Sequence, residues 1–139
     1  MKIGIKNLQK KLTIKPKKIR ELILNILKGE KKGESGYINI CFADDALIKK
    51  FNSRFLKNNS STDVLAFNLN DDKIGKILLA DIMISADTAI NNAARFKTEP
   101  EYELMLYVTH GVLHILGYDD RDRVKKKQMR KKELEYVHR

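Results

Sequence analysis

The sequence contains a single cysteine, Cys41, in a chain of 139 residues. One thiol cannot form an internal disulfide bond, which excludes the small secreted domains that disulfides hold together. Cys41 lies in the apolar stretch YINICF, where we expect it to pack as a small hydrophobic residue. A reducing, cytoplasmic environment is the expectation that follows.

Long apolar runs are also missing. No stretch approaches the roughly 18 consecutive apolar residues that a membrane-spanning helix needs. The basic N-terminal region is not followed by the apolar segment of a signal peptide, because ELILNILK is short and Asn25 interrupts it. We therefore expect neither a membrane partner nor a secretion signal.

The chain has no tryptophan and only 7% aromatic residues, so little stacking on nucleic-acid bases and weak sequence selectivity are expected. Basic residues are abundant, with 28 lysines and arginines against 18 acidic residues and a formal net charge of +10. The excess gathers in two runs, KNLQKKLTIKPKKIR and RDRVKKKQMRKK, and such a charge attracts polyanions such as RNA. A solvated, lysine-rich surface is the alternative explanation for either run alone.

The length and the 42% of hydrophobic residues predict one domain over residues 1–139. Strands are expected at KIGI, YINICF, VLAFNL and KILLADIMIS, the last two forming a hairpin through NDDKIGK. Helices are expected between and after them. This irregular mixture favours an α+β fold, in which several helices pack on a small mixed sheet.

Capping and breaking residues predict where the helices begin and end. The first three are signalled by these residues: Pro16 and Gly29 for the first, Asp44 for the second, and Ser85 or Asp87 with Phe96 for the third. The fourth runs from about Glu99 to Leu116, where Thr98 and Glu101 have capping-box spacing and Gly117 is the stop. A basic helix ends the chain.

Two of the three histidines, His110 and His114, lie four residues apart on the fourth predicted helix. This spacing puts both rings on one face, close enough to bind one metal ion. Apolar residues surround them on most sides of the helix, and burying two imidazoles without a partner is costly. The alternative is a pair of histidines that pack in the core without a metal.

A metal site needs a third ligand, and the turn after this helix supplies candidates. Gly117 lets the chain reverse, so Asp120, six residues after His114, can approach the ion with its carboxylate. Asp119 is the alternative ligand, although its spacing fits less well and it is also a candidate cap for the last helix. The third histidine, His138, lies among charged residues and is expected on the surface.

The intervals between these residues match the long zincin protease motif, H-E-x-x-H-x-x-G-x-x-H. In that motif the glutamate beside the first histidine is the general base. Here Gly111 occupies its position and can neither take a proton nor hold a water molecule. The spacing therefore predicts a zincin-like metal helix, whereas peptide hydrolysis by this route is disfavoured.

The stretch HGVLHILGYDD, residues 110–120, resembles the hallmark H-G-x-L-H-L-x-G-Y-D-H of the YbeY-type metal-dependent endoribonucleases of bacteria. The glycine after the first histidine is part of that hallmark. Three other blocks resemble the family in the same order: FNSRFL (51–56), STDVLAF (61–67) and ADIMIS (80–85). The blocks span most of the chain.

The resemblance implies the small α+β fold of that family, with one Zn²⁺ per chain held by His110, His114 and Asp120 in a basic cleft. It implies hydrolysis of single-stranded RNA, with roles in 3′-end maturation of small-subunit (16S) ribosomal RNA and in ribosome quality control. The implied partners are single-stranded RNA, ribosomal RNA and the small ribosomal subunit.

The sequence departs from the family pattern at two positions. The family's third ligand is usually a histidine, and Asp120 adds a negative charge that shifts the preference toward harder metal ions. The arginine that the family uses for the substrate phosphate aligns with Leu56, so Arg54 and Lys57 are the candidates for that role. The general base is unassigned among Asp119, a metal hydroxide and the 2′-hydroxyl of the substrate.

Two other functions stay open on the sequence alone. One is an RNA- or ribosome-binding module in which the metal is structural. The other is a zincin-like metallopeptidase, against which Gly111 argues.

Overall fold

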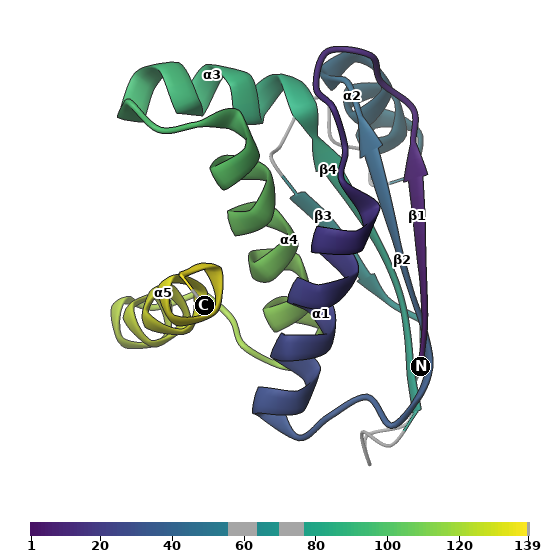
Figure 1. Cartoon of the computed structure of the whole chain (residues 1–139), viewed down its shortest axis with the longest axis vertical. Coiled ribbons are helices and arrows are strands. Elements are labelled where there is room, and N and C mark those ends of the chain that lie inside the picture. Colours follow the sequence, from purple (N-terminus) through teal and green to yellow (C-terminus); the bar gives the residue numbers. More distant parts are fainter. Residues whose placement is uncertain (56–63, 70–76, 139) are drawn as a thin grey trace.

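The structure, a computed structural model, describes residues 1–55, 64–69 and 77–138. In this part of the chain a mixed sheet of four strands forms the centre, and five helices pack against it or against one another (Figure 1). The elements follow in the order β1 (Lys2–Asn7), α1 (Pro16–Glu30), β2 (Ser35–Ala43), α2 (Asp45–Phe55), β3 (Val64–Asn68), β4 (Ile77–Ser85), α3 (Ala86–Phe96), α4 (Pro100–Ile115) and α5 (Arg123–Val137). The predicted α+β fold is confirmed.

The strands of the sheet lie in the order β1-β2-β4-β3. β1, β2 and β4 are parallel, while β3 runs antiparallel to β4 at one edge. The predicted hairpin is confirmed by the register, in which Val64 pairs with Ile84 and Asn68 with Ala80. Its connection, NDDKIGK, lies outside the described residues.

One face of the sheet forms the core with α1 and α4, which lie across it (Figure 1). Side chains alternate along a strand, so every second residue of β2 and β4 points into this core. The fully buried residues of this face are Ile38, Ile40, Phe42, Ala80, Ile82 and Ile84. Their neighbours Asn39 and Asp81 are exposed on the opposite face. The sheet therefore has one dry face, and α4 is sandwiched between that face and α5.

The first helix begins at Pro16, as predicted, but it does not stop at Gly29. It continues to Glu30, and Lys31 ends it in a left-handed conformation with φ of 56°. A Cβ atom at position 29 would collide with the hydroxyl of Tyr136 on α5. The glycine therefore permits the close approach of two helices instead of ending one of them.

The capping predictions for the later helices have mixed outcomes. Ser85 caps α3 by accepting a hydrogen bond from the amide of Thr88 at 2.9 Å, as expected. The capping box of Thr98 and Glu101 is wrong, because Pro100 takes the first helical position and makes Glu99 the N-cap. Thr98 instead donates its hydroxyl hydrogen bond to the carboxylate of Glu103, at 3.0 Å.

Two other expectations concern membrane-spanning helices and the environment of Cys41. No helix among the described residues combines the length and the apolar character needed to cross a membrane. Cys41 is partly buried on β2, and this burial raises the pKa of its thiol. It alternates with the core residues Ile40 and Phe42 and lines a pocket on the opposite face of the sheet, so it lies outside the hydrophobic core.

Candidate metal centre

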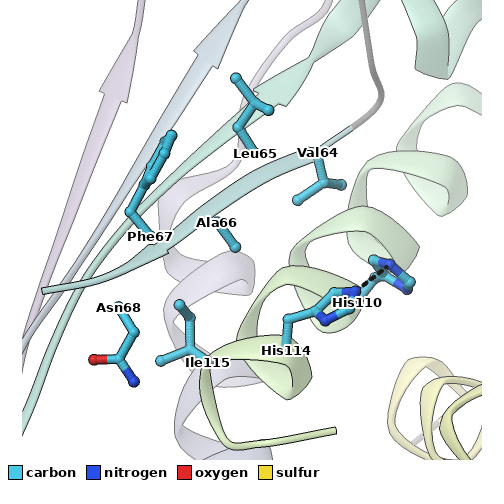
Figure 2. A pocket seen from close by; sticks show the side chains of 8 residues that line it. All are labelled: Val64, Leu65, Ala66, Phe67, Asn68, His110, His114 and Ile115. Atoms are coloured by element: carbon cyan, nitrogen blue, oxygen red, sulfur yellow. Dashed lines mark hydrogen bonds between the residues drawn. The ribbon is translucent and has the colours of Figure 1, made fainter. Parts of the chain in front are cut away.

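The two histidines lie on the same face of α4, and their rings face one another (Figure 2). The rest of α4 is mostly buried, because it is the central helix of the fold. The side chains of His110 and His114 keep 26% and 31% exposure. They open into a pocket of about 350 Å³, lined by residues 64–68 of β3 together with His110, His114 and Ile115. The histidines therefore lie at an accessible edge of an otherwise buried helix.

His110, His114 and Asp120 bring three ligand atoms together. The Nε2 atoms of the histidines are 3.1 Å apart, and oxygens of Asp120 lie 3.9 Å from Nε2 of His110 and 4.0 Å from Nε2 of His114. Two ligands of one tetrahedral zinc ion, each about 2.1 Å from it, are separated by about 3.4 Å. The three side chains thus need only sub-ångström adjustments to hold one ion.

A glycine turn returns Asp120 to the histidines. Gly117 has φ of 107°, a conformation that favours glycine. Its amide donates to the carbonyl of His114 and the amide of Tyr118 donates to that of Leu113, both at 3.0 Å. These two bonds form a Schellman motif, which satisfies the last carbonyls of α4 and reverses the chain. The role predicted for Gly117 is confirmed.

Asp119 points to other partners. Its carboxylate accepts hydrogen bonds from the backbone amide and the guanidinium of Arg121, at 3.2 and 3.0 Å, and lies 3.7 Å from Nζ of Lys125. The hydrogen bond from the Arg121 side chain holds the pKa of Asp119 below its usual range. Asp119 is not the cap of α5 either, because Asp122 accepts from the amide of Lys125. Of the two aspartates of the turn, Asp120 joins the histidines.

The glycine between the histidines has a packing reason. A Cβ atom on Gly111 would lie 2.9 Å from Cγ2 of Ile82 and 3.1 Å from Cγ1 of Val64. Both distances are shorter than ordinary carbon contacts, so α4 approaches the sheet too closely for a side chain here. A glutamate, as in the zincin motif, has no room at this position.

Two carboxylates that sequence reasoning missed support the centre. Glu133 of α5, buried to 5% exposure, hydrogen bonds to Nδ1 of His110. The available signal was the spacing of Met129, Glu133 and Tyr136, which marks the buried face of an otherwise charged helix. The second carboxylate is Glu30, at the end of α1.

Glu30 ties the turn that follows α4 to two helices. Its carboxylate accepts a hydrogen bond from the hydroxyl of Tyr118, at 2.6 Å, and another from the hydroxyl of Tyr136. Nζ of Lys132 lies 3.4 Å from the same carboxylate. Burial alone would raise the pKa of Glu30, but these hydrogen bonds and the lysine charge outweigh it and lower the pKa. The hydrogen bond to Glu30 raises the pKa of Tyr118 to about 12. Tyr118 lies between His114 and Asp120 in the sequence, so its hydrogen bond to Glu30 anchors the segment that joins them.

The substrate-binding candidates of the sequence are not placed. Arg54 belongs to α2, but its side chain is not among those described, and Lys57 and Leu56 lie outside the described residues. His138 is exposed, as expected, with its ring centre 5.9 Å from that of Tyr102. It takes no part in the metal centre.

The two basic runs lie at different ends of α4. Lys15 and Lys18 of the first run pair with Glu101, at the start of the helix. The second run forms α5, which reaches the metal centre through Glu133. The basic surface of α5 is therefore the one that adjoins the histidines.

The donor set fits a divalent metal ion. Two imidazole nitrogens and one carboxylate are suitable ligands for zinc, and three protein ligands leave a position open. The hydrogen bond to Glu133 engages the far nitrogen of His110, as is usual for a metal-binding histidine. The convergence of the three side chains and the hydrogen bond behind His110 are therefore both compatible with a metal ion at this place.

Comparisons with known proteins point the same way. A model of the family described as endoribonuclease YbeY matches residues 4–139. Relatives named endoribonuclease YbeY include the protein of Caldicellulosiruptor bescii, 35% identical over 96% of this chain and 93% of its own length, and that of Syntrophus aciditrophicus, 37% identical over 86% and 76%. The solution structure of TM1509 from Thermotoga maritima matches with a TM-score of 0.69 and 27% identity, covering 98% of this chain and 87% of that chain. The chain therefore belongs to the endoribonuclease YbeY family.

Proposed function

We propose that this chain, an RNA-cleaving hydrolase by its family, cuts single-stranded RNA with one Zn²⁺ held by His110, His114 and Asp120. The observation that carries the proposal is the convergence of three ligand atoms beside an open pocket. Residues 1–139 act as one domain in this proposal, because the sheet, α1, α4 and α5 contribute to one hydrophobic core.

The reaction needs stabilisation of negative charge on a phosphodiester. A divalent ion, if held at this centre, would supply Lewis-acid polarisation of the phosphoryl group. His110 and His114 would hold the ion through imidazole nitrogens, and Asp120 would add a carboxylate ligand. Asp119 is a poor general base, because Arg121 and Lys125 engage its carboxylate and its pKa is lowered. Of the three candidates for the general base, Asp119 is therefore the least favoured.

The surface beside the centre suits a polyanion. α5 carries six exposed basic residues that can neutralise RNA phosphates: Arg123, Lys125, Lys126, Lys127, Arg130 and Lys131. The pocket wall opposite the histidines comes from β3, whose Val64 and Ala66 give it an apolar lining. In this proposal, an RNA strand bound in the pocket has its sugar-phosphate backbone near α5 and its reacting phosphate near the histidines.

The exposure of the centre favours catalysis over a structural metal. Structural zinc sites are closed by four protein ligands, whereas catalytic sites keep one position open. Within the described part of the chain three side chains converge, and they are 26%, 31% and 46% exposed. Gly111 and its close packing on Ile82 argue against the peptidase alternative.

The cellular role follows from the sequence resemblance. We propose maturation of the 3′ end of 16S ribosomal RNA and ribosome quality control in the cytoplasm, with the small ribosomal subunit as partner. The net charge of +10 supports contact with ribosomal RNA.

A cleavage assay on end-labelled single-stranded RNA tests the proposal. His110→Ala should lower the cleavage rate by on the order of 100-fold or more, because the ion loses a ligand. His138→Ala is the matched control, since this exposed histidine lies outside the centre, and it should cleave at the wild-type rate.

The assay also separates the alternatives. Wild-type protein that binds the RNA without cutting it indicates a binding module with a structural metal. Hydrolysis of peptides in place of RNA indicates a peptidase. Equal RNA cleavage by His110→Ala and wild type contradicts the proposed centre.

A further inference from the structure

A carboxylate on α5 contacts the metal centre from the side opposite the pocket. Glu133 hydrogen bonds to Nδ1 of His110, and its other carboxylate oxygen lies 3.4 Å from Nη1 of Arg130. The Glu133 side chain is only 6% exposed, while that of Arg130 is 54% exposed. The helix thus inserts one buried acid among its exposed basic residues, directly behind a proposed ligand.

This contact decides which nitrogen of His110 is available. A neutral imidazole has one N–H donor and one acceptor nitrogen, and a carboxylate can only accept. Nδ1 must therefore donate to Glu133, which leaves the lone pair on Nε2. Nε2 is the atom that faces His114 at 3.1 Å and Asp120 at 3.9 Å. Glu133 therefore selects the tautomer that can bind the ion.

We propose that Glu133 is a positioning residue of the metal centre: its carboxylate fixes the tautomer and the ring orientation of His110 and so raises the affinity for the ion. The inference rests on the proposed metal site and adds a residue outside the three ligands. Its consequence is that α5, which begins after the metal-binding turn, helps to set the metal affinity.

The alternative role for Glu133 is only to dock α5 on α4. Met129 and Tyr136, at 1% and 3% exposure, already bury the same face of α5. Tyr136 is also tied to Glu30. Burying a carboxylate costs free energy unless it is paired, so an apolar residue would serve docking alone better. The position of the carboxylate at Nδ1 of His110 is what docking leaves unexplained.

Arg130 completes the arrangement from the solvent side. It lies one helical turn before Glu133 and approaches the carboxylate oxygen that His110 does not use. Its charge offsets that of the buried carboxylate, and its contact limits rotation of the carboxyl group. Because its side chain is half exposed, we expect Arg130→Gln to weaken zinc binding less than a change at Glu133.

Zinc dissociation constants of Glu133 variants test the inference. They are measured on zinc-free protein by competition with a chromophoric chelator. Glu133→Ala should bind zinc 10- to 100-fold more weakly, the usual effect of removing such a partner. Glu133→Gln keeps an acceptor oxygen without the charge and should fall between. Glu135→Gln removes the same charge from an exposed position two residues away and should bind as wild type does.

A second readout needs no metal. Side-chain nitrogen NMR of zinc-free protein, recorded at a pH above which the ring nitrogen shifts no longer change, reports the tautomer of each ring. Wild type should show His110 with its proton on Nδ1, and Glu133→Ala should show a population with the proton on Nε2. Loss of packing alone, without a change of proton acceptor, does not produce this shift.

The outcomes separate this inference from the function proposed above. A wild-type protein that binds no zinc overturns the metal site itself. Tight binding by wild type together with equal affinity in Glu133→Ala, or an unchanged His110 tautomer, overturns the role of Glu133 alone. If circular dichroism shows that Glu133→Ala does not fold, Glu133→Gln decides, and an affinity equal to that of Glu135→Gln overturns the inference.

Discussion

Gly111 is the residue whose meaning changes most between sequence and structure. Beside a metal-binding histidine it looks like a catalytic glutamate that has been lost. In the fold it is the point where α4 meets Ile82 and Val64. The residue therefore serves the packing that holds both histidines at the edge of the sheet.

Gly111→Ala should destabilise the protein although alanine favours helices. The added methyl group overpacks the contact with Ile82 at a cost of about 1–3 kcal/mol, against a gain of about 1 kcal/mol in helix propensity. We expect the free energy of unfolding in urea to fall by about 1 kcal/mol. The same substitution in an Ile82→Ala background should cost less. A stabilised Gly111→Ala protein would contradict the packing explanation.

Asp120 sets the chemical character of the centre. A carboxylate is a harder ligand than imidazole, so it favours harder metal ions more than a third histidine does. Asp120→His should increase the preference for Zn²⁺ over Mn²⁺ by roughly tenfold, about 1.4 kcal/mol. Competition titrations with both metals measure the ratio. An unchanged ratio means that Asp120 is not a ligand.

The sequence indicates the three proposed ligands but not the residues that support them. His110, His114 and Asp120 are recognisable because one helix and one turn join them within eleven residues. Glu133 is 23 residues from His110, and only the folding of α5 back onto α4 brings the two together. Long-range contacts of this kind leave no spacing pattern in the chain.

Glu30 joins the elements around the turn that carries Asp120. This carboxylate receives Tyr118 from the turn and Tyr136 from α5, so three segments meet at the end of α1. Hydrogen bonds to the charged form lower the pKa of Glu30 in the folded protein. A group of this kind contributes stability above its unfolded pKa and loses it as the pH falls through the folded value.

Glu30→Gln should therefore change the pH dependence of stability. At neutral pH the variant should unfold with about 1–2 kcal/mol less free energy, since the hydrogen bonds to a charged acceptor are lost. The difference from wild type should shrink as the pH falls below about 4.5, where the unfolded carboxyl group becomes protonated. Urea unfolding at about pH 7 and pH 3 measures both values. A pH-independent difference contradicts the role of the charge.

Element types were predictable, whereas several ends were not. Apolar spacing located the helices and strands, and Asp44 caps α2 as expected, with its carboxylate 2.8 Å from the amide of Leu47. The ends differed where tertiary contacts compete with local signals. Gly29 lies inside α1 and leaves space for Tyr136, while Lys31 ends the helix. Thr98 is not a cap because Pro100 starts α4.

At the scale of the whole molecule, the two basic runs lie in different surroundings. In the basic run near the N-terminus, Lys15 and Lys18 form ion pairs with Glu101 near the start of α4. The basic run of α5 lies next to the histidines. The net charge was evident in the sequence. The position of the basic run of α5 beside the histidines was not, because that position depends on how α5 packs on α4.

Replacing Lys126, Lys127 and Lys131 of α5 together by glutamine should weaken RNA binding and its salt dependence. Each phosphate contact on a single strand contributes about 0.7 to the slope of log affinity against log salt, so the slope should fall by up to about 2. The matched control replaces Lys10, Lys17 and Arg20, exposed residues of the other run. Equal loss in both triple variants contradicts a binding surface on α5.

The strand order also belongs to the scale of the whole molecule. The hairpin of β3 and β4 was predictable because the two strands are neighbours in the sequence. The parallel pairing of β2 with β4 joins strands separated by α2 and β3, and no local pattern encodes it. This pairing places β3 at the edge of the sheet, where it becomes one wall of the pocket.

The most direct test of the metal-dependent mechanism is the rate of RNA cleavage as zinc is returned to zinc-free protein. The rate should be near zero without metal, rise with added Zn²⁺, and level off at about one ion per chain, as expected for a catalytic site with three protein ligands. His114→Ala should show no such saturation. Cleavage by the zinc-free protein at the full rate, or identical curves for wild type and His114→Ala, would contradict the account.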